Sequence, residues 1–176
     1  LLYDKNKYED ARKLFETITT SPEPAIAAAG TAGVIRSLSG LKDASGLEAY
    51  CRKVLSTATQ PSLLLIAANA LGDAAFVKKD YGAARDLYIQ SVVRHNPGRG
   101  GGVEREHERA LYRLGECYEA LFAAAKDAKL KDFISAMASS TFRELSVEYP
   151  SGRYREVAAA KSVKYEAKEE KKEEKK

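Results

Sequence analysis

The sequence predicts an all-α fold of antiparallel helix pairs, and three observations lead to that prediction. Apolar residues recur at helical spacing, and no segment alternates with period two as a half-buried strand would. Ala, Leu, Glu, Lys and Arg, which favour helices, dominate the composition. Gly and Pro gather at boundaries between the periodic segments. The 176 residues are 44% hydrophobic, enough to bury the core of one domain.

Four helices are expected in the first half of the chain. Residues 5–19 carry an apolar stripe, and Ser21-Pro22-Glu23-Pro24 separates them from a helix over 24–38. Ser39-Gly40 marks the end of that helix. A third helix, over 42–58, has a packing stripe of its own: Leu47, Tyr50, Cys51 and Val54. Gln60-Pro61-Ser62 precedes the fourth, over 62–78.

Four more helices are expected in the second half. A helix over 81–95 shows apolar periodicity, and the stretch Asn96 to Gly102 follows it. Two longer helices, over 104–126 and 130–148, meet near Lys126 to Lys131. Tyr149-Pro150-Ser151-Gly152 precedes the last helix, over 152–168. In the tail, residues 166–176, like charges lie at i,i+4, so we expect a solvated or frayed end.

Internal repetition joins these helices into units. Leu71-Gly72-x-x-Ala75 is followed by Ala84-x-x-x-Tyr88 and Pro97. Leu114-Gly115-x-x-Tyr118 is followed by Ala138-x-x-x-Phe142 and Pro150. The chain begins with Ala11-x-x-x-Phe15 and Pro22, the second half of the same pattern. These residues resemble the tetratricopeptide repeat, a 34-residue helix pair.

The resemblance implies a right-handed α-solenoid of about three and a half to four repeats with a capping helix. Residues 1–22 would hold the second helix of a truncated repeat, and 24–60 a degenerate one in which Gly33 fits the glycine position without a following aromatic. Residues 62–97 and 104–150 would be full repeats, the latter with lengthened helices. Residues 152–165 would cap the stack, using Tyr154, Val157, Val163 and Tyr165.

Glycine inside a helix costs about 1 kcal/mol relative to alanine, so Gly72 and Gly115 need a compensating contact. We expect the partner helix to approach closely at Ala84 and Ala138. Tyr88 and Phe142, one turn later, would fill the space between successive pairs.

The resemblance also implies a non-catalytic interaction scaffold, whose first helices line a groove for a peptide or a partner helix. The family register places seven residues there: Asn69, Asp73, Phe76, Arg109, Tyr112, Glu116 and Glu119. Core packing is the alternative for Phe76 and Tyr112. Asp73 and Glu116 stand where chaperone-binding members carry carboxylate-clamping residues, so a basic or apolar partner is expected.

The sequence gives little support to catalysis, metal or cofactor binding. Cys51 and Cys117 lack metal or redox spacing and are expected to be buried thiols, with a disulfide as the alternative. Glu104-x-x-His107 is half of a di-iron motif without its second copy, so we expect an exposed first-turn histidine. The stretch from Pro97 to Gly102 lacks the Walker ending and is expected to be a linker.

Charge and hydropathy exclude two further classes of partner. The net charge is only +4, and no base-stacking aromatic residues are interleaved with the basic ones, so no nucleic acid is expected as a partner. No apolar run is long enough to span a bilayer. Arg94, Arg99 and Arg105 flank the glycine-rich stretch and could meet an acidic partner.

Compartment and assembly are open at this point. The chain starts at Leu1 without Met, so we expect its native start to lie upstream. The Phe142 to Tyr154 segment is similar to closing turns of bacterial envelope tetratricopeptide proteins, which favours the periplasm over the cytoplasm. Besides a scaffold, a self-associating spacer and a helical metal protein or enzyme remain alternatives.

Overall fold

The computed structural model describes residues 7–96 and 102–173, and side chains as far as residue 166. The all-α prediction is confirmed, because these residues form eight α-helices and a short π-helical segment and contain no strand. In chain order the elements are α1 (Tyr8–Ile18), α2 (Pro24–Leu41), α3 (Ala44–Thr57), α4 (Pro61–Val77), α5 (Tyr81–Ile89), η2 (Gln90–Arg94), α6 (Glu104–Ala124), α7 (Ala128–Glu148) and α8 (Arg155–Glu173).

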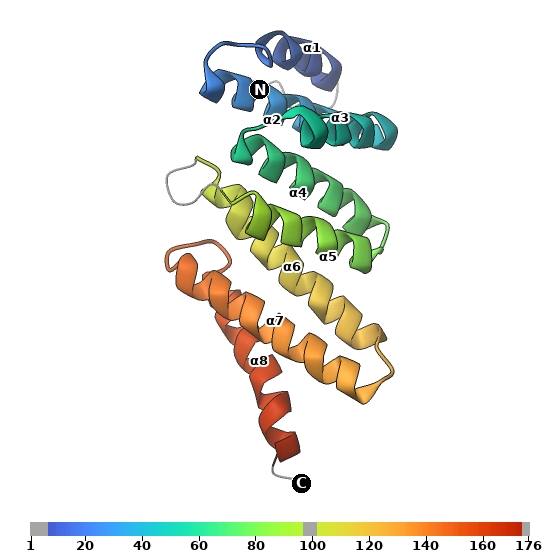
Figure 1. Ribbon diagram of the computed structural model, residues 1–176, viewed down its shortest axis with the longest axis vertical. Helices are drawn as coiled ribbons and strands as arrows, with labels where there is room; N and C mark the ends of the chain where they lie inside the picture. Colours follow the sequence, from blue (N-terminus) through green and yellow to red (C-terminus); the bar gives the residue numbers. More distant parts are fainter. Residues whose placement is uncertain (1–6, 97–101, 174–176) are drawn as a thin grey trace.

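The helices form an elongated stack in which each packs against the next along the chain. Helix α1 lies at one end and α8 at the other (Figure 1). The α2–α3, α4–α5 and α6–α7 turns lie along one edge, on the right in Figure 1, and the α1–α2, α3–α4 and α7–α8 turns lie along the other. Residues in every second turn therefore lie along the same edge of the molecule.

Short polar signals set where the helices begin. Pro24 and Pro61 occupy the first turns of α2 and α4, where a missing N–H costs nothing. Asp43, Asp80 and Asp127 cap α3, α5 and α7, their side chains accepting hydrogen bonds from backbone N–H groups three residues on, at 2.8–3.0 Å. Helices α3, α5 and α7 thus each begin after a capping aspartate.

The core has two clusters of buried side chains. One joins α2, α3 and α4 around Val34, Leu38 and Leu71, and the other joins α5 to α8 around Tyr88, Leu111 and Phe142. In α3, the predicted stripe is confirmed, with Tyr50 half-buried and its other members buried. Cys51 and Cys117 are free and buried as expected, and burial raises the pKa of each thiol to about 12.

Gly33, Gly72 and Gly115 each lie directly under an aromatic ring. A Cβ added at Gly72 would lie 2.8 Å from Cε1 of Tyr88, and one at Gly115 would overlap the ring of Phe142. Tyr88 and Phe142 therefore rest on the glycine of their own pair, rather than only filling the space between pairs. At Gly33 the ring comes from Phe15 of α1, the preceding helix. This explains why no aromatic residue is needed in α3.

Helix α8 differs from the prediction in two respects. Its backbone is helical as far as Glu173, beyond the expected end at residue 168 and into the tail expected to be solvated or frayed. Glu, Lys and Ala are strong helix formers, which favours this extension. Of its expected capping residues, Tyr165 is buried, whereas Val157 and Val163 are 48% and 61% exposed. Ala158, fully buried, takes the place of the two valines.

Candidate functional site

A groove of about 1250 Å³ opens between α2, α4 and α6. Its floor is apolar and includes Ala32, Ile35, Ile66 and Ala70. The turn between α7 and α8, residues 148–154, forms a further wall. Three of the seven predicted groove residues line it: Asn69, Asp73 and Arg109.

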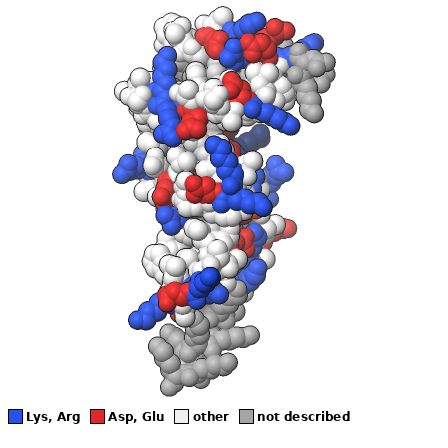
Figure 2. All heavy atoms as spheres, turned by 90° about the vertical axis from the view of Figure 1, so that its right-hand side faces the viewer, with Lys and Arg blue, Asp and Glu red and all other residues white. Residues whose placement is uncertain are grey.

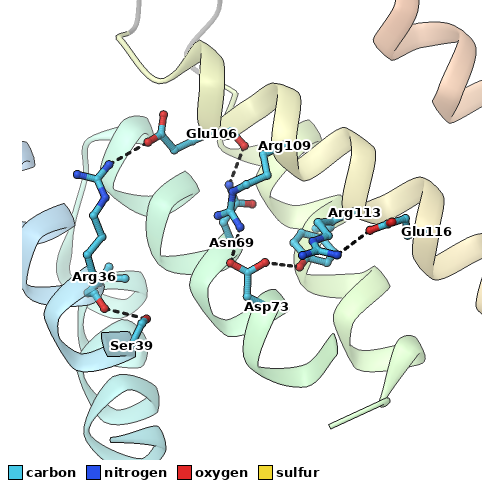
Figure 3. Close-up of polar contacts among 10 residues, drawn as sticks. Arg36, Ser39, Asn69, Asp73, Glu106, Arg109, Arg113 and Glu116 are labelled. Atoms are coloured by element: carbon cyan, nitrogen blue, oxygen red, sulfur yellow. Dashed lines mark hydrogen bonds and ion pairs between the residues drawn. The ribbon is translucent and has the colours of Figure 1, made fainter. Parts of the chain in front are cut away.

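Asn69 and Asp73 of α4 lie next to Arg109 of α6 (Figure 3), and Asp73 also binds Tyr88 of α5. Arg109 forms an ion pair with Asp73, Nη1 to Oδ2 2.5 Å, and the hydroxyl of Tyr88 donates to Oδ1 of Asp73 at 2.7 Å. Burial, and then the charge of Asp73, raise the pKa of Tyr88, so its hydroxyl stays protonated and remains a donor.

Asn69 is 1% exposed, and its Nδ2 donates to the backbone carbonyl of Glu106 at 3.0 Å. Its Oδ1 is buried and has no hydrogen-bond partner among the residues described. An unsatisfied buried acceptor lowers the free energy of unfolding, so this oxygen destabilises the groove wall.

A second ion pair crosses the groove from α2 to α6. Nη2 of Arg36 lies 3.1 Å from Oε1 of Glu106 (Figure 3). Because Arg36 is 58% exposed, the pair contributes little to folding. An incoming ligand can therefore displace Arg36 at small cost.

The other four predicted groove residues lie outside the groove and serve contacts within the chain. The ring of Phe76 lies edge-on to Tyr81 and beneath the guanidinium of Arg113, 4.8 Å away, and Arg113 also pairs with Glu116. Tyr112 stacks on Tyr154 with ring centroids 4.3 Å apart.

Glu119 is held by α8. It pairs with Lys161 and accepts a hydrogen bond from the hydroxyl of Tyr165 at 3.2 Å. The side chains of Glu119 and Lys161 are 20% and 24% exposed. The face of α6 that the register assigned to a ligand is thus covered here by the chain's own last helix.

The prediction of an exposed His107 is wrong. His107 is 2% exposed, with Nδ1 2.7 Å from the hydroxyl of Tyr149 and Nε2 3.3 Å from the carbonyl of Val92. Beside it, buried Glu108 accepts a hydrogen bond from the backbone N–H of Tyr154 at 3.0 Å. The two side chains hold the turn that walls the groove. Local spacing gave no signal of this, because their partners in that turn are more distant in the sequence.

Among the residues that the structure describes, no three His, Cys, Asp or Glu side chains gather closely enough to hold a metal ion. None of the helices found there is long and apolar enough to cross a membrane. Residues 97–101 of the expected linker, which runs from Pro97 to Gly102 and contains Arg99, lie outside the described residues, while Arg94 and Arg105 on either side of it are exposed.

Comparison of the chain with protein family models, with curated proteins and with solved structures returned no match. The helices of the groove, its two ion pairs and its apolar floor are the features that a ligand would meet.

Proposed function

We propose that this protein is a non-catalytic interaction scaffold whose groove between α2, α4 and α6 receives a peptide or a helical segment of a partner protein. The observation that supports this most is the groove itself, about 1250 Å³ in volume and lined by three alternate helices of the stack. That volume exceeds the range typical of small-molecule pockets, about 300–1000 Å³, and suits a chain segment.

The same proposal takes the stack to be a tetratricopeptide-type α-solenoid. The contacts of Gly72 with Tyr88 and of Gly115 with Phe142 support it, since they recur at the same step of two successive pairs. So does the packing of each helix on the next along the chain. In this arrangement α2, α4 and α6 are the first helices of successive units, and α8 covers the last unit.

The groove favours a partner that combines apolar and basic side chains. Its floor is apolar, and Arg36 and Arg109 are already paired with Glu106 and Asp73. Glu104 and Glu148 add acidic groups to the lining, and Arg105 and Arg153 add basic ones. Basic side chains of a ligand could therefore compete for the groove carboxylates, while its apolar ones would lie on the floor.

A pair of tryptophan variants tests this proposal. Ser39 is an exposed residue of α2 that lines the groove, with its hydroxyl bonded to the carbonyl of Ile35. Ser56 is an exposed residue of α3 with the same kind of hydroxyl bond, to Lys53, and it does not line the groove. Peptides selected from a random library against the wild-type chain should bind Ser56→Trp normally. Ser39→Trp should bind them at least about tenfold more weakly, a loss of about 1.4 kcal/mol.

Fluorescence anisotropy of labelled peptides measures the difference. Far-ultraviolet circular dichroism of both variants checks that the helices are intact. Equal affinity of the selected peptides for the two variants would contradict binding in the groove.

A further inference from the structure

One short motif recurs at three alternate turns of the stack. An apolar residue, one or two lysines and the capping aspartate follow one another at each turn: Leu41-Lys42-Asp43, Val77-Lys78-Lys79-Asp80 and Ala125-Lys126-Asp127. These are the α2–α3, α4–α5 and α6–α7 turns, which share one edge of the molecule (Figure 1). We call this edge the lysine edge. Lys129 and Lys131, in the first turn of α7, extend it.

The aspartates and lysines of the lysine edge have different roles. Asp43, Asp80 and Asp127 are occupied in capping helices. The five lysines 42, 78, 79, 126 and 129 are exposed, and none forms an ion pair within the described side chains. Lys42 and Lys79 have positive φ values of 58° and 62°, in a conformation that glycine usually occupies at helix ends. Lysine is thus present at two positions where backbone conformation alone would favour glycine.

Exposed apolar side chains lie beside these lysines. Val77 is 82% exposed next to Lys78, and Leu41 is 37% exposed next to Lys42. Leu130 and Phe133, 48% and 63% exposed, lie next to Lys129 and Lys131 in α7. Figure 2 views this edge face on and shows Lys and Arg side chains at successive levels of the stack, interspersed with Asp and Glu.

The opposite edge has a different composition. Its described turns, residues 19–23, 58–60 and 149–154, contain no lysine, and their one cationic residue is Arg153. The asymmetry between the two edges indicates a surface with a distinct role.

We propose that the lysine edge docks onto an anionic lipid surface. Three turns arranged along one side of an elongated molecule can all touch a flat bilayer at once. The exposed apolar side chains would enter the headgroup region, and the neighbouring lysines would lay their apolar stems along it with their charges toward lipid phosphates. An acidic protein would match the lysines but gives no reason for Val77 and Phe133 to be exposed beside them. The surface is separate from the groove, whose lining includes none of these residues.

Vesicle co-sedimentation of the whole chain tests the proposal. The probes are vesicles of phosphatidylcholine alone and of an equal mixture of phosphatidylcholine and phosphatidylglycerol. One variant replaces lysines 42, 78, 79 and 126 with glutamine. The control replaces four exposed cationic residues in α1, α3, η2 and α8, Lys13, Lys53, Arg94 and Arg155, with glutamine, so both variants lose the same charge. Val77→Ser removes only apolar contact and remains informative if the fourfold edge variant fails to fold.

Wild-type protein and the control should sediment with the mixed vesicles and not with phosphatidylcholine alone. The edge variant should bind more than about tenfold more weakly, because each lysine near an anionic surface is worth about fivefold in affinity. Val77→Ser should also weaken binding, and salt should reduce binding throughout.

Three results would overturn the proposal. The first is no sedimentation of wild-type protein at low salt. The second is an equal loss in the edge variant and the control, which would indicate attraction by net charge alone. The third is wild-type binding by Val77→Ser together with full competition by soluble polyglutamate, which would indicate an acidic protein partner.

Discussion

At the scale of single residues, glycine occupies two kinds of position in these helices. Gly72 and Gly115 lie under the rings of Tyr88 and Phe142, where a Cβ would collide with the ring. Gly82, in the first turn of α5, has open space, and the nearest atom to an added Cβ is Oδ1 of Asp80 at 3.8 Å. The first kind allows close packing of two elements, and the second only lowers helix propensity.

Alanine substitution separates these two roles. Gly115→Ala should destabilise the protein by about 1–3 kcal/mol, because overpacking against Phe142 exceeds the gain of about 1 kcal/mol in helix propensity. Gly82→Ala has no such clash and should stabilise it by up to about 1 kcal/mol. Urea denaturation followed by circular dichroism measures both. Shifts of the same sign in the two variants would contradict the packing assigned to Gly115.

At the scale of elements, α8 is joined to α6 by polar and aromatic contacts rather than by an apolar stripe. Lys161 pairs with Glu119 and its Nζ lies 5.3 Å from the ring centroid of Tyr112, and Tyr165 donates to the carboxylate of Glu119. Ser135 and Ser139 of α7 donate to backbone carbonyls of α8. Val157 and Val163 were predicted to cap the stack, but they lie on the face of α8 that remains in solvent.

A double-mutant cycle tests the attachment of α8. Glu119→Ala and Lys161→Ala should show a coupling of about 0.5–2 kcal/mol in the free energy of unfolding, since the pair is largely buried and hydrogen-bonded. The more exposed pair Glu48 and Arg52 in α3 is the matched control and should couple more weakly. Equal coupling in the two cycles would show that Lys161 and Glu119 do not hold α8 on α6.

At the scale of the whole molecule, the buried clusters divide the stack into two parts. Helices α2 to α4 share one cluster and α5 to α8 the other, and contacts run mainly between neighbours in the chain. In such a linear arrangement a local defect weakens its neighbours most. The groove lies across the boundary, because α2, α4 and α6 all line it.

Hydrogen exchange measured by mass spectrometry tests this division. Leu145→Ala, at a fully buried position of α7, should cost about 2–5 kcal/mol and raise amide exchange first in α6, α7 and α8. Val34→Ala, at a fully buried position of α2, should instead raise exchange first in α2, α3 and α4. A uniform loss of protection in either variant would mean that the stack unfolds as one unit.

Most of the fold could be predicted from local signals, whereas the groove could be predicted only in part. Helix bounds followed from apolar spacing and from boundary residues such as Pro24 and Pro61. The repeat register brought Asn69, Asp73 and Arg109 into the groove but assigned Tyr112 and Glu119 to a ligand. The structure instead places Glu119 against Lys161 of α8 and stacks Tyr112 on Tyr154 of the α7–α8 turn.

The sequence by itself determined the helical elements, their starting points and the glycines that accept rings, since each depends on residues within a turn or a single helix pair. Tertiary structure alone decided the burial of His107 and Glu108 and the wall that they hold, because their partners in the α7–α8 turn are distant in the sequence. It also decided the lysine edge. The motif is visible in the chain, but only the alternation of helix directions brings its three copies to one side of the molecule.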